Sequence, residues 1–573
     1  MPSMASLHLP PSAGNASSDS SPSNPRYTPV SNSDDDSLMQ RSGKSSAGQL
    51  KLQTDFGDSV EVGGPVEEGD EEIAYESGEE LEGKKARRRT KAPKYTLDEE
   101  REVVRSFDRR LVPFLALLYL LSFLDRSNIG NAKIAGLEED LQLSSSQYEW
   151  LLTAFYITYI VFEWMTLMYR LVPPHIYISL CVFGWGIVAS FQCLATSFEG
   201  LVVLRALLGI TEAAFGPGVP FYLSLFYKRQ ELALRNGLFI SAAPLATSFA
   251  SSLAWVIVKC SNDGPISPWR ILFLVEGFPS VIVAVFAWAI IPDSPGRARF
   301  LTRRQRVVAR LRLEENKPNY QNAPEKRFNW REIVKTASDP KAYMAAFMFF
   351  SCNVAFSSMP VFLPTIIKDM GYSSLHSQAL SAPPYLFAFI VVLITAYFSD
   401  RTRTRSTYLI AHALLSSLSY LCIALTGYFH THLTPSLHTF IRYICVYPAV
   451  AGFFSAITLI ITWSMDNRTE KEGKGASIAI LNIIGQCGPL LGTRLYPQSD
   501  GPWYVKGMAV CSFFMLVVAV LAVGLRVLLQ RENRVQAGSL DGAKGRERDG
   551  LMGGGRRSDL EGHTGNQRLV YII

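Results

Sequence analysis

The chain has 573 residues, a net charge of +6 and a composition that is 48% hydrophobic and only 18% charged. Soluble proteins usually contain about 25% charged residues, and here the shortage is local, since eight windows of 19 or more residues contain no Asp, Glu, Lys or Arg. One such window fits a soluble core, but eight predict membrane-spanning helices. The composition therefore excludes a soluble protein, and the positive charge belongs to loops rather than to a nucleic-acid surface.

The sequence also argues against catalytic and metal-binding classes. It contains no HExxH, GxSxG or Walker loop, so we expect no enzyme. Its eight cysteines form no Cys-x-x-Cys pair, and we expect neither a metal site, a cofactor nor a disulfide framework. The N-terminus lacks a basic start followed by an apolar core, so no cleavable signal peptide is predicted.

In chain order, residues 1–105 are predicted to form a disordered cytoplasmic tail, rich in Ser, Gly, Pro and acidic residues and ending in a basic run. Twelve spanning helices are predicted to follow. Their expected ranges are 111–131, 149–169, 175–196, 200–226, 236–258, 270–291, 342–367, 375–398, 406–427, 439–463, 475–496 and 507–529.

These helices fall into two six-helix halves, 106–292 and 342–529, which a central loop at 293–341 separates. That loop holds thirteen Lys and Arg against six Asp and Glu, so it belongs on the cytoplasmic side. Both termini are then cytoplasmic, and residues 530–573 are predicted to form a second disordered tail. The fold class is an all-α membrane protein.

The fourth predicted helix carries two charges on one face. Arg205, Gly209, Glu212 and Gly216 follow at i, i+4, i+7 and i+11. Arg205 and Glu212 are about 10.5 Å apart along the helix axis, so each needs a partner elsewhere or water. The glycine between them leaves room for a ligand or for another backbone.

The first predicted helix carries a second pair, Asp125 and Arg126, with Arg126 on one face together with Tyr119 and Ser122. A charged side chain at the centre of a bilayer costs about 2.5–3.5 kcal/mol, and its default interpretation is a substrate or proton pathway. If both helices line one cavity, two cations and two carboxylates meet there. An organic anion could then bind an arginine only when a carboxylate takes up a proton.

Static roles stay open for the same residues. Asp125 and Glu212 could form salt bridges that only fix helix packing, and Arg126 could clamp one end of the cavity. Glu163 and Glu276 lie near predicted helix ends, which favours a structural or interfacial role. Asn482, in the eleventh predicted helix, could bind a ligand or a facing backbone.

Several segments together resemble a known family. They are YLLSFLDRSNIGNAKIAGLEEDL (119–141), RALLGITEAAFGPG (205–218), YLSLFYKRQELALRNG (222–237), WRILFLVEGFPS (269–280), PDSPGRARFL (292–301), SDRTRTR (399–405) and LYPQSDGPWYVKG (495–507). From about 107 to 529 the chain resembles the major facilitator superfamily, and within it the anion:cation symporter branch and its fungal allantoate-permease-like group.

The resemblance implies two halves that rock around a site at the bilayer midplane. It implies proton coupling at Asp125 and Glu212. It also implies substrate binding at Arg126, Arg205, Tyr159 and Asn482. Finally, it implies a gating motif at Asp400 and Arg401.

The chain also departs from the family pattern. The sequence Glu163-Trp-Met-Thr-Leu replaces the usual Glu-x-Pro-x-Asn, and Phe123 stands where some relatives have a tyrosine. The glycine-proline motif of antiporters is not recognisable in ISAAPLATSFASS (240–252), which favours symport over exchange.

We therefore expect a monomeric secondary transporter that moves a small organic anion together with protons by alternating access. The expected partners are this carboxylate, protons and the lipid bilayer, with no nucleic acid. The plasma membrane is the expected location, and the vacuolar membrane stays open. An efflux exchanger of the same fold and a nutrient sensor that does not transport are the alternatives.

Overall fold

The computed structural model describes residues 95–228, 231–261, 264–314, 330–467 and 471–552, and its regular elements are helices. In the N-terminal half the main helices are α2 (Leu97–Ala132), α4 (Ser145–Phe162), α5 (Pro174–Phe191), α6 (Phe198–Glu212), α7 (Phe215–Leu223), α8 (Leu232–Ser261) and α9 (Pro268–Ile290). In the C-terminal half they are α12 (Pro340–Asp369), α13 (Ser374–Thr402), α14 (Ser406–Tyr428), α15 (Pro435–Asp466), α16 (Lys471–Gly485), α17 (Gly488–Gly492) and α18 (Val505–Met552).

Local chemistry sets several helix starts. Thr96 and Ser144 begin α2 and α4 with capping boxes, in which the side chain and the residue three positions later satisfy each other's backbone amides. Proline occupies the first turn of α5, α9, α12 and α15, where its missing N–H is not needed.

Within the described residues, nine helices are long and apolar enough to cross a membrane. The other three predicted spans correspond to α2, whose first turns are charged, and to two interrupted pairs, α6 with α7 and α16 with α17. This agrees with the prediction of twelve spans in an all-α membrane fold.

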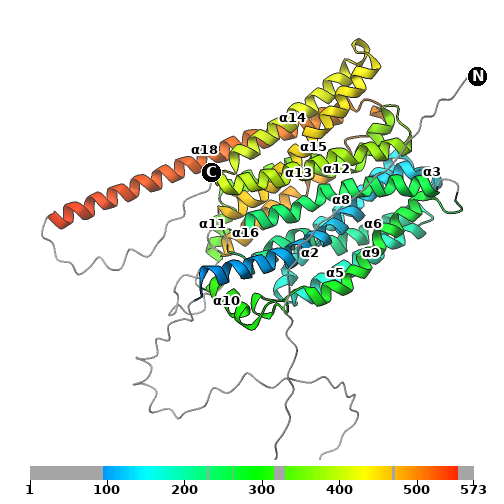
Figure 1. The fold of residues 1–573 in the computed structure, drawn as a ribbon. Helices are drawn as coiled ribbons and strands as arrows, with labels where there is room; N and C mark the ends of the chain where they lie inside the picture. The colour runs from blue at the N-terminus through cyan, green and yellow to red at the C-terminus, as the bar shows by residue number, and fades with distance from the viewer. Residues whose placement is uncertain (1–94, 229–230, 262–263, 315–329, 468–470, 553–573) are drawn as a thin grey trace, which may run out of the picture. The chain divides into compact units, whose positions relative to one another are not determined.

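Figure 1 shows how the helices pack side by side. In the N-terminal half α2 packs on α8 and α9, α4 on α6, and α5 on α9. In the C-terminal half α14 packs on α15 and α18, and α12 on α16, α17 and α18. The halves meet along α8 with α13, α2 with α12, and α4 with α17.

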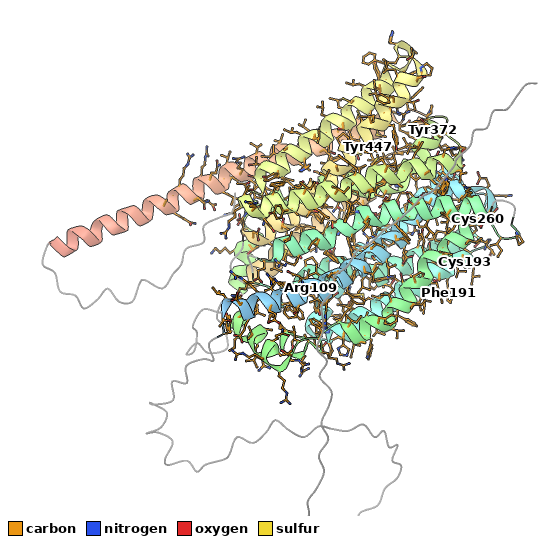
Figure 2. All side chains as sticks on the ribbon, in the orientation of Figure 1. Arg109, Phe191, Cys193, Cys260, Tyr372 and Tyr447 are labelled. Carbon is orange, nitrogen blue, oxygen red and sulfur yellow. The ribbon has the colours of Figure 1, made fainter. Side chains whose placement is uncertain are left out.

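The bundle has two ends, named here after elements near them. The α10 end holds the start of α2 and the helix α10 (Arg303–Glu314), and the α3 end holds η1 (Lys133–Leu137) and α3 (Glu138–Asp140). Figure 2 shows Arg109 at the α10 end, and Cys193, Cys260 and Tyr372 at the opposite end.

The described parts of the central loop contain two helices, α10 and α11 (Trp330–Ala337). Arg312 of α10 is fully buried and pairs with Glu100 of α2 and with Glu231. Arg304 lies 2.9 Å from Glu99, and its hydrogen bond lowers the pKa of that carboxyl to about 2. The basic loop is therefore held to the start of α2 by ion pairs.

Two expected tail boundaries differ from the helix ends. Helix α2 already begins at Leu97, inside the range 1–105, and α18 stays helical to Met552, past the expected end of the span at 529. Charged residues continue a helix readily once an apolar span has nucleated it. Residues 1–94 and 553–573 lie outside the described residues.

The halves touch closely at the α3 end. A Cβ atom added to Gly130 of α2 would collide with the backbone of Val361 of α12. Nearby, the Thr153 and Thr493 hydroxyls lie 3.2 Å apart, and the Arg494 guanidinium lies 4.9 Å from the ring centre of Trp150. These contacts join α4 to the segment after α17 at this end.

We expect Gly130→Ala to destabilise the protein, because the obstacle is backbone that cannot rotate away. Overpacking of this kind typically costs about 1–3 kcal/mol. Thermal unfolding of the purified protein measures the change. Gly524→Ala in α18 is the matched control, since a Cβ there meets only the terminal methyl of Met344, and it should be neutral or slightly stabilising. Equal stabilities for the two variants would contradict the close approach.

Candidate functional site

A cavity of about 80 Å³ lies where the two halves meet. It lies at the depth of the middle of α2 and extends toward the last turns of α15, that is, toward the α10 end. From the N-terminal half its walls are Tyr119, Arg126, Tyr156, Tyr159, Gly216, Pro217, Pro220, Phe239 and Ile240. From the C-terminal half they are Phe349, Asn353, Phe356, Ile457, Ile461, Ser464, Met465, Ile478, Leu481, Asn482, Gln486 and Pro489.

Both interrupted helix pairs reach this cavity. The break between α6 and α7 is followed by Pro217 and Pro220, and the break between α16 and α17 is followed by Pro489. Proline has no N–H to donate to the carbonyl four residues earlier. At Pro489 that carbonyl belongs to Gly485, and the Asn353 side-chain amide donates to it instead, at 3.0 Å. Interrupted helices in the two halves of a membrane protein are typical of a ligand site.

An ion pair links the cavity wall to the fourth span. The Arg126 guanidinium donates to Oε2 of Glu212 from Nη2 at 2.9 Å and from Nε at 3.3 Å. Ser122 donates to the same oxygen at 2.9 Å. The Glu212 side chain is fully buried, whereas that of Arg126 is 11% exposed. Arg126 therefore borders the cavity, whereas the Glu212 carboxylate is buried behind it.

Aromatic rings hold Arg126 from its other sides. The guanidinium carbon lies 4.8 Å from the ring centre of Tyr159 and 5.1 Å from that of Phe155, both on α4. Phe123 is a third ring, at 5.9 Å. Ring faces attract a cation without neutralising it, so the arginine stays available to a second anion.

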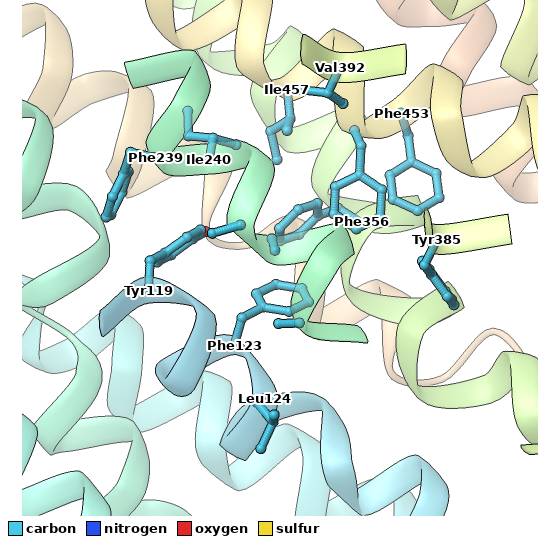
Figure 3. Close-up of a cluster of buried hydrophobic side chains, with 14 of the residues drawn as sticks. Tyr119, Phe123, Leu124, Phe239, Ile240, Phe356, Tyr385, Val392, Phe453 and Ile457 are labelled. Atoms are coloured by element: carbon cyan, nitrogen blue, oxygen red, sulfur yellow. The ribbon is translucent and has the colours of Figure 1, made fainter. Parts of the chain in front are cut away.

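The aromatic cluster of Figure 3 forms one side of the cavity and joins the halves. Tyr119 of α2 packs on Phe239 of α8 with ring centres 4.4 Å apart, and Phe123 packs on Phe356 of α12 at 5.3 Å. Phe123 is buried among rings, where a tyrosine hydroxyl would need a hydrogen-bond partner. This accounts for a phenylalanine at this position.

Arg205 is placed differently from the expectation that both arginines face one cavity. It is 1% exposed, it does not contribute to the described cavity wall, and its Nε and Nη1 find no hydrogen-bond partner among the described residues. Glu212 and Asp125 are near enough for their charges to act on it. Gly209, one turn along, faces the backbone of Phe155 in α4, so the space beside it admits another helix rather than a ligand.

Asp125 also faces away from the cavity, toward α9. Its Oδ2 accepts a hydrogen bond of 3.1 Å from Ser280, and its charge acts on Glu276, which is 2% exposed. Neither carboxylate oxygen of Glu276 has a hydrogen-bond partner among the described residues. Of the four charged residues expected around one cavity, only Arg126 lines the central cavity in this conformation.

Glu276 lies in the middle of α9, which corrects the sequence-based placement near a helix end. The helix begins two residues earlier than expected, at Pro268, so the glutamate lies about half a turn deeper in it. The closeness of Glu276 to Asp125 is visible only in the folded structure, because the sequence of α9 does not show which helix this glutamate faces. Glu163, directly after the end of α4, is also a buried carboxylate. It is 8% exposed, and both its carboxylate oxygens lack a hydrogen-bond partner in the described structure.

Tyr159 and Asn482, the other two expected substrate residues, line the cavity from opposite halves. Gln486 follows Asn482 by one helical turn and lines it as well. Neither Asn353 nor Gln486 was identified from the sequence, because an amide in an apolar helix gives no signal of the direction it faces.

In the gating motif between α13 and α14, Asp400 has an arginine partner that was not identified from the sequence. Asp400 pairs with Arg405, which is 6% exposed and also lies 3.3 Å from Asp466 of α15. Arg401 is exposed and contacts only the Tyr397 hydroxyl, at 3.4 Å, among the described residues. Helix α13 ends at Thr402, and Arg401 lies on its exposed side. Arg405 lies after the turn that follows α13, and its side chain reaches back to Asp400.

No group of three His, Cys, Asp or Glu side chains within the described part of the chain could hold a metal ion. The chemistry of the site is therefore that of one partly exposed arginine, its buried carboxylate and a wall of amides and aromatic rings.

Comparisons with known proteins agree with this architecture. An uncharacterized transporter of Schizosaccharomyces pombe is 31% identical over 457 residues, which cover 79% of this chain and 92% of that protein. The high-affinity nicotinic acid transporter of Saccharomyces cerevisiae is 28% identical over 444 residues, which cover 77% and 80%.

Two solved structures share the fold. One is a bacterial homologue of the human lysosomal transporter Spinster, in an inward-facing, unoccupied conformation, with a TM-score of 0.53 and 17% identity over 76% of this chain and 99% of that chain. The other is the proton:xylose symporter XylE, with a TM-score of 0.55 and 13% identity over 73% and 95%. Residues 115–493 match the Major Facilitator Superfamily. The chain therefore belongs to this superfamily and is a membrane transporter rather than an enzyme.

Proposed function

We propose that the protein is a proton-coupled symporter of a small organic anion, a carboxylate, in the anion:cation symporter branch of the superfamily. The observation that supports this most directly is the position of Arg126, which pairs with Glu212 on one side and borders the central cavity on the other. The nicotinic acid transporter among the relatives acts on a carboxylate, which fits the same chemistry.

The coupling follows from charge balance in a medium of low dielectric constant. While Glu212 is ionised, it satisfies Arg126, and a second anion would leave the site with excess negative charge. A proton on Glu212 removes that charge, and Arg126 can then bind a substrate carboxylate through the two parallel hydrogen bonds that a guanidinium favours. Proton and anion therefore bind together, and one proton moves with each monoanion without net charge.

We assign Arg205 and Asp125 to the same cycle at a later stage. A buried, unpartnered guanidinium is costly, so Arg205 is expected to gain an anion or water when the α3 end opens. Asp125 then exchanges its proton with Glu212 or with solvent. Tyr159 and Asn482 are proposed to orient the substrate from the two halves.

Alternating access requires each end to open in turn. The present cavity of about 80 Å³ is far below the roughly 300–1,000 Å³ of ligand pockets, so it must widen to admit a substrate. We propose that the α10 end, with its basic loop, is cytoplasmic, that Asp400 and Arg405 with Arg401 control opening there, and that the protein acts as a monomer in the plasma membrane.

The first experiment tests coupling. In proteoliposomes, Glu212→Gln should abolish accumulation driven by an imposed pH gradient, while counterflow of labelled carboxylate continues, because the neutral amide mimics the protonated acid permanently. Glu199→Gln, on the exposed first turn of the same helix, is the control and should accumulate substrate like the unaltered protein. Undiminished pH-driven accumulation by Glu212→Gln would refute the coupling role.

A second experiment tests carboxylate recognition. Arg126→Lys keeps the charge but loses the paired donors, so the apparent affinity for carboxylates should fall at least about tenfold. Arg526→Lys, in α18 and outside the central cavity, should leave the affinity unchanged. The apparent affinity of each variant is obtained by measuring the rate of uptake at a series of substrate concentrations. If both variants match the unaltered protein, Arg126 does not bind the substrate.

A further inference from the structure

A second cavity, of about 510 Å³, lies at the α10 end of the N-terminal half. It is enclosed by α2, the start of α5, the end of α9 and the segment that follows α9. Its walls are Arg110, Phe114, His175, Trp288, Ala289, Ile290, Ile291, Pro292, Asp293, Arg297, Arg299 and Phe300. None of these residues lines the central cavity.

The cavity carries excess positive charge. Asp293 is already engaged, since its Oδ1 lies 2.7 Å from Nδ1 of His175. Arg110, Arg297 and Arg299 are exposed, and none of them forms an ion pair with a carboxylate in the described part of the chain. Arg110 lies over the Phe300 ring, 5.7 Å from its centre. Three guanidinium groups thus face one hollow with no free carboxylate between them.

The other walls are apolar and continue into the outer surface of α9. Trp288 is 52% exposed, and Phe286 and Val285, in the preceding turn, are 56% and 69% exposed. Exposed apolar residues also occur further along the helix, at Phe278 and Ile282. A tryptophan at the end of a spanning helix is typical of the level of lipid headgroups.

We propose that this cavity binds an anionic phospholipid. The headgroup phosphate is held by Arg110, Arg297 and Arg299, and an acyl chain lies along the exposed apolar residues of α9. Basic pockets between spanning helices at the positively charged side of a membrane protein are suited to such headgroups, and guanidinium groups bind phosphate oxygens through paired hydrogen bonds. The cavity volume of about 510 Å³ is large enough for a phospholipid headgroup. The adjoining apolar surface of α9 favours a lipid over a soluble phosphate, because only the lipid has an acyl chain to cover it.

The proposal has a structural consequence. The cavity joins α2 and α5 to the segment that connects α9 with α10, so a lipid bound there would stabilise the N-terminal half. This inference does not rest on the proposed transport mechanism, because the two cavities share no residue.

The test uses the full-length protein in a neutral detergent. Phosphatidic acid and phosphatidylinositol should raise the unfolding temperature and appear as bound lipid in native mass spectra, whereas phosphatidylcholine should do neither. Glycerol 3-phosphate at the same concentration should give no shift. The triple variant Arg110→Gln, Arg297→Gln, Arg299→Gln should bind the anionic lipids at least about tenfold more weakly.

The matched control is Arg101→Gln, Arg105→Gln, Arg109→Gln, which removes three exposed charges from α2 at the same end but outside the cavity. It should bind the anionic lipids like the unaltered protein. If the cavity variant loses folded protein, Arg297→Gln and Arg299→Gln are measured singly, and each should weaken binding. Equal lipid binding by the cavity and control variants would overturn the proposal, as would an equal shift with phosphatidylcholine or with glycerol 3-phosphate.

Discussion

The ion pair between Arg126 and Glu212 is the interaction on which the central site depends. Removing one partner of a buried pair typically costs about 3–5 kcal/mol, because the other charge is left without compensation. Here the two charges lie on different helices, α2 and α6, and Ser122 adds a third contact to the same carboxylate oxygen. The pair therefore fixes the first span against the fourth, and it also sets which charge the cavity presents.

The two partners of this ion pair differ in their exposure to the cavity. Arg126 is partly exposed and ringed by aromatic faces, whereas Glu212 is sealed behind it. An anion that enters the cavity meets the arginine first, and only a change on the hidden carboxylate frees that arginine. Asp125, Glu276 and Arg205 form a deeper set of charged groups inside the N-terminal half, out of contact with the cavity in this conformation.

Backbone geometry supplies the means of movement. The breaks before Pro217 and Pro489 place short helices beside the cavity, and the amide of Asn353 satisfies a carbonyl that the second break leaves free. At the α3 end, Gly130 allows α2 and α12 to approach closely. Such contacts between packed helices have discrete alternatives rather than a continuous range, which suits a protein whose two halves close at one end at a time.

The spans, the division into halves and the charged residues of interest were predictable from the amino-acid sequence, because a bilayer requires long apolar helices and makes a charge within them conspicuous. Which polar groups pair is seen only in the folded protein: Arg126 with Glu212, Asp125 with Ser280, and Asp400 with Arg405. The tertiary structure also showed that Glu276 lies beside Asp125 and that Arg205 lies behind the cavity wall. Helical spacing gives the face of one helix, but the partner across that face depends on the packing of segments far apart in the chain, which no local pattern encodes.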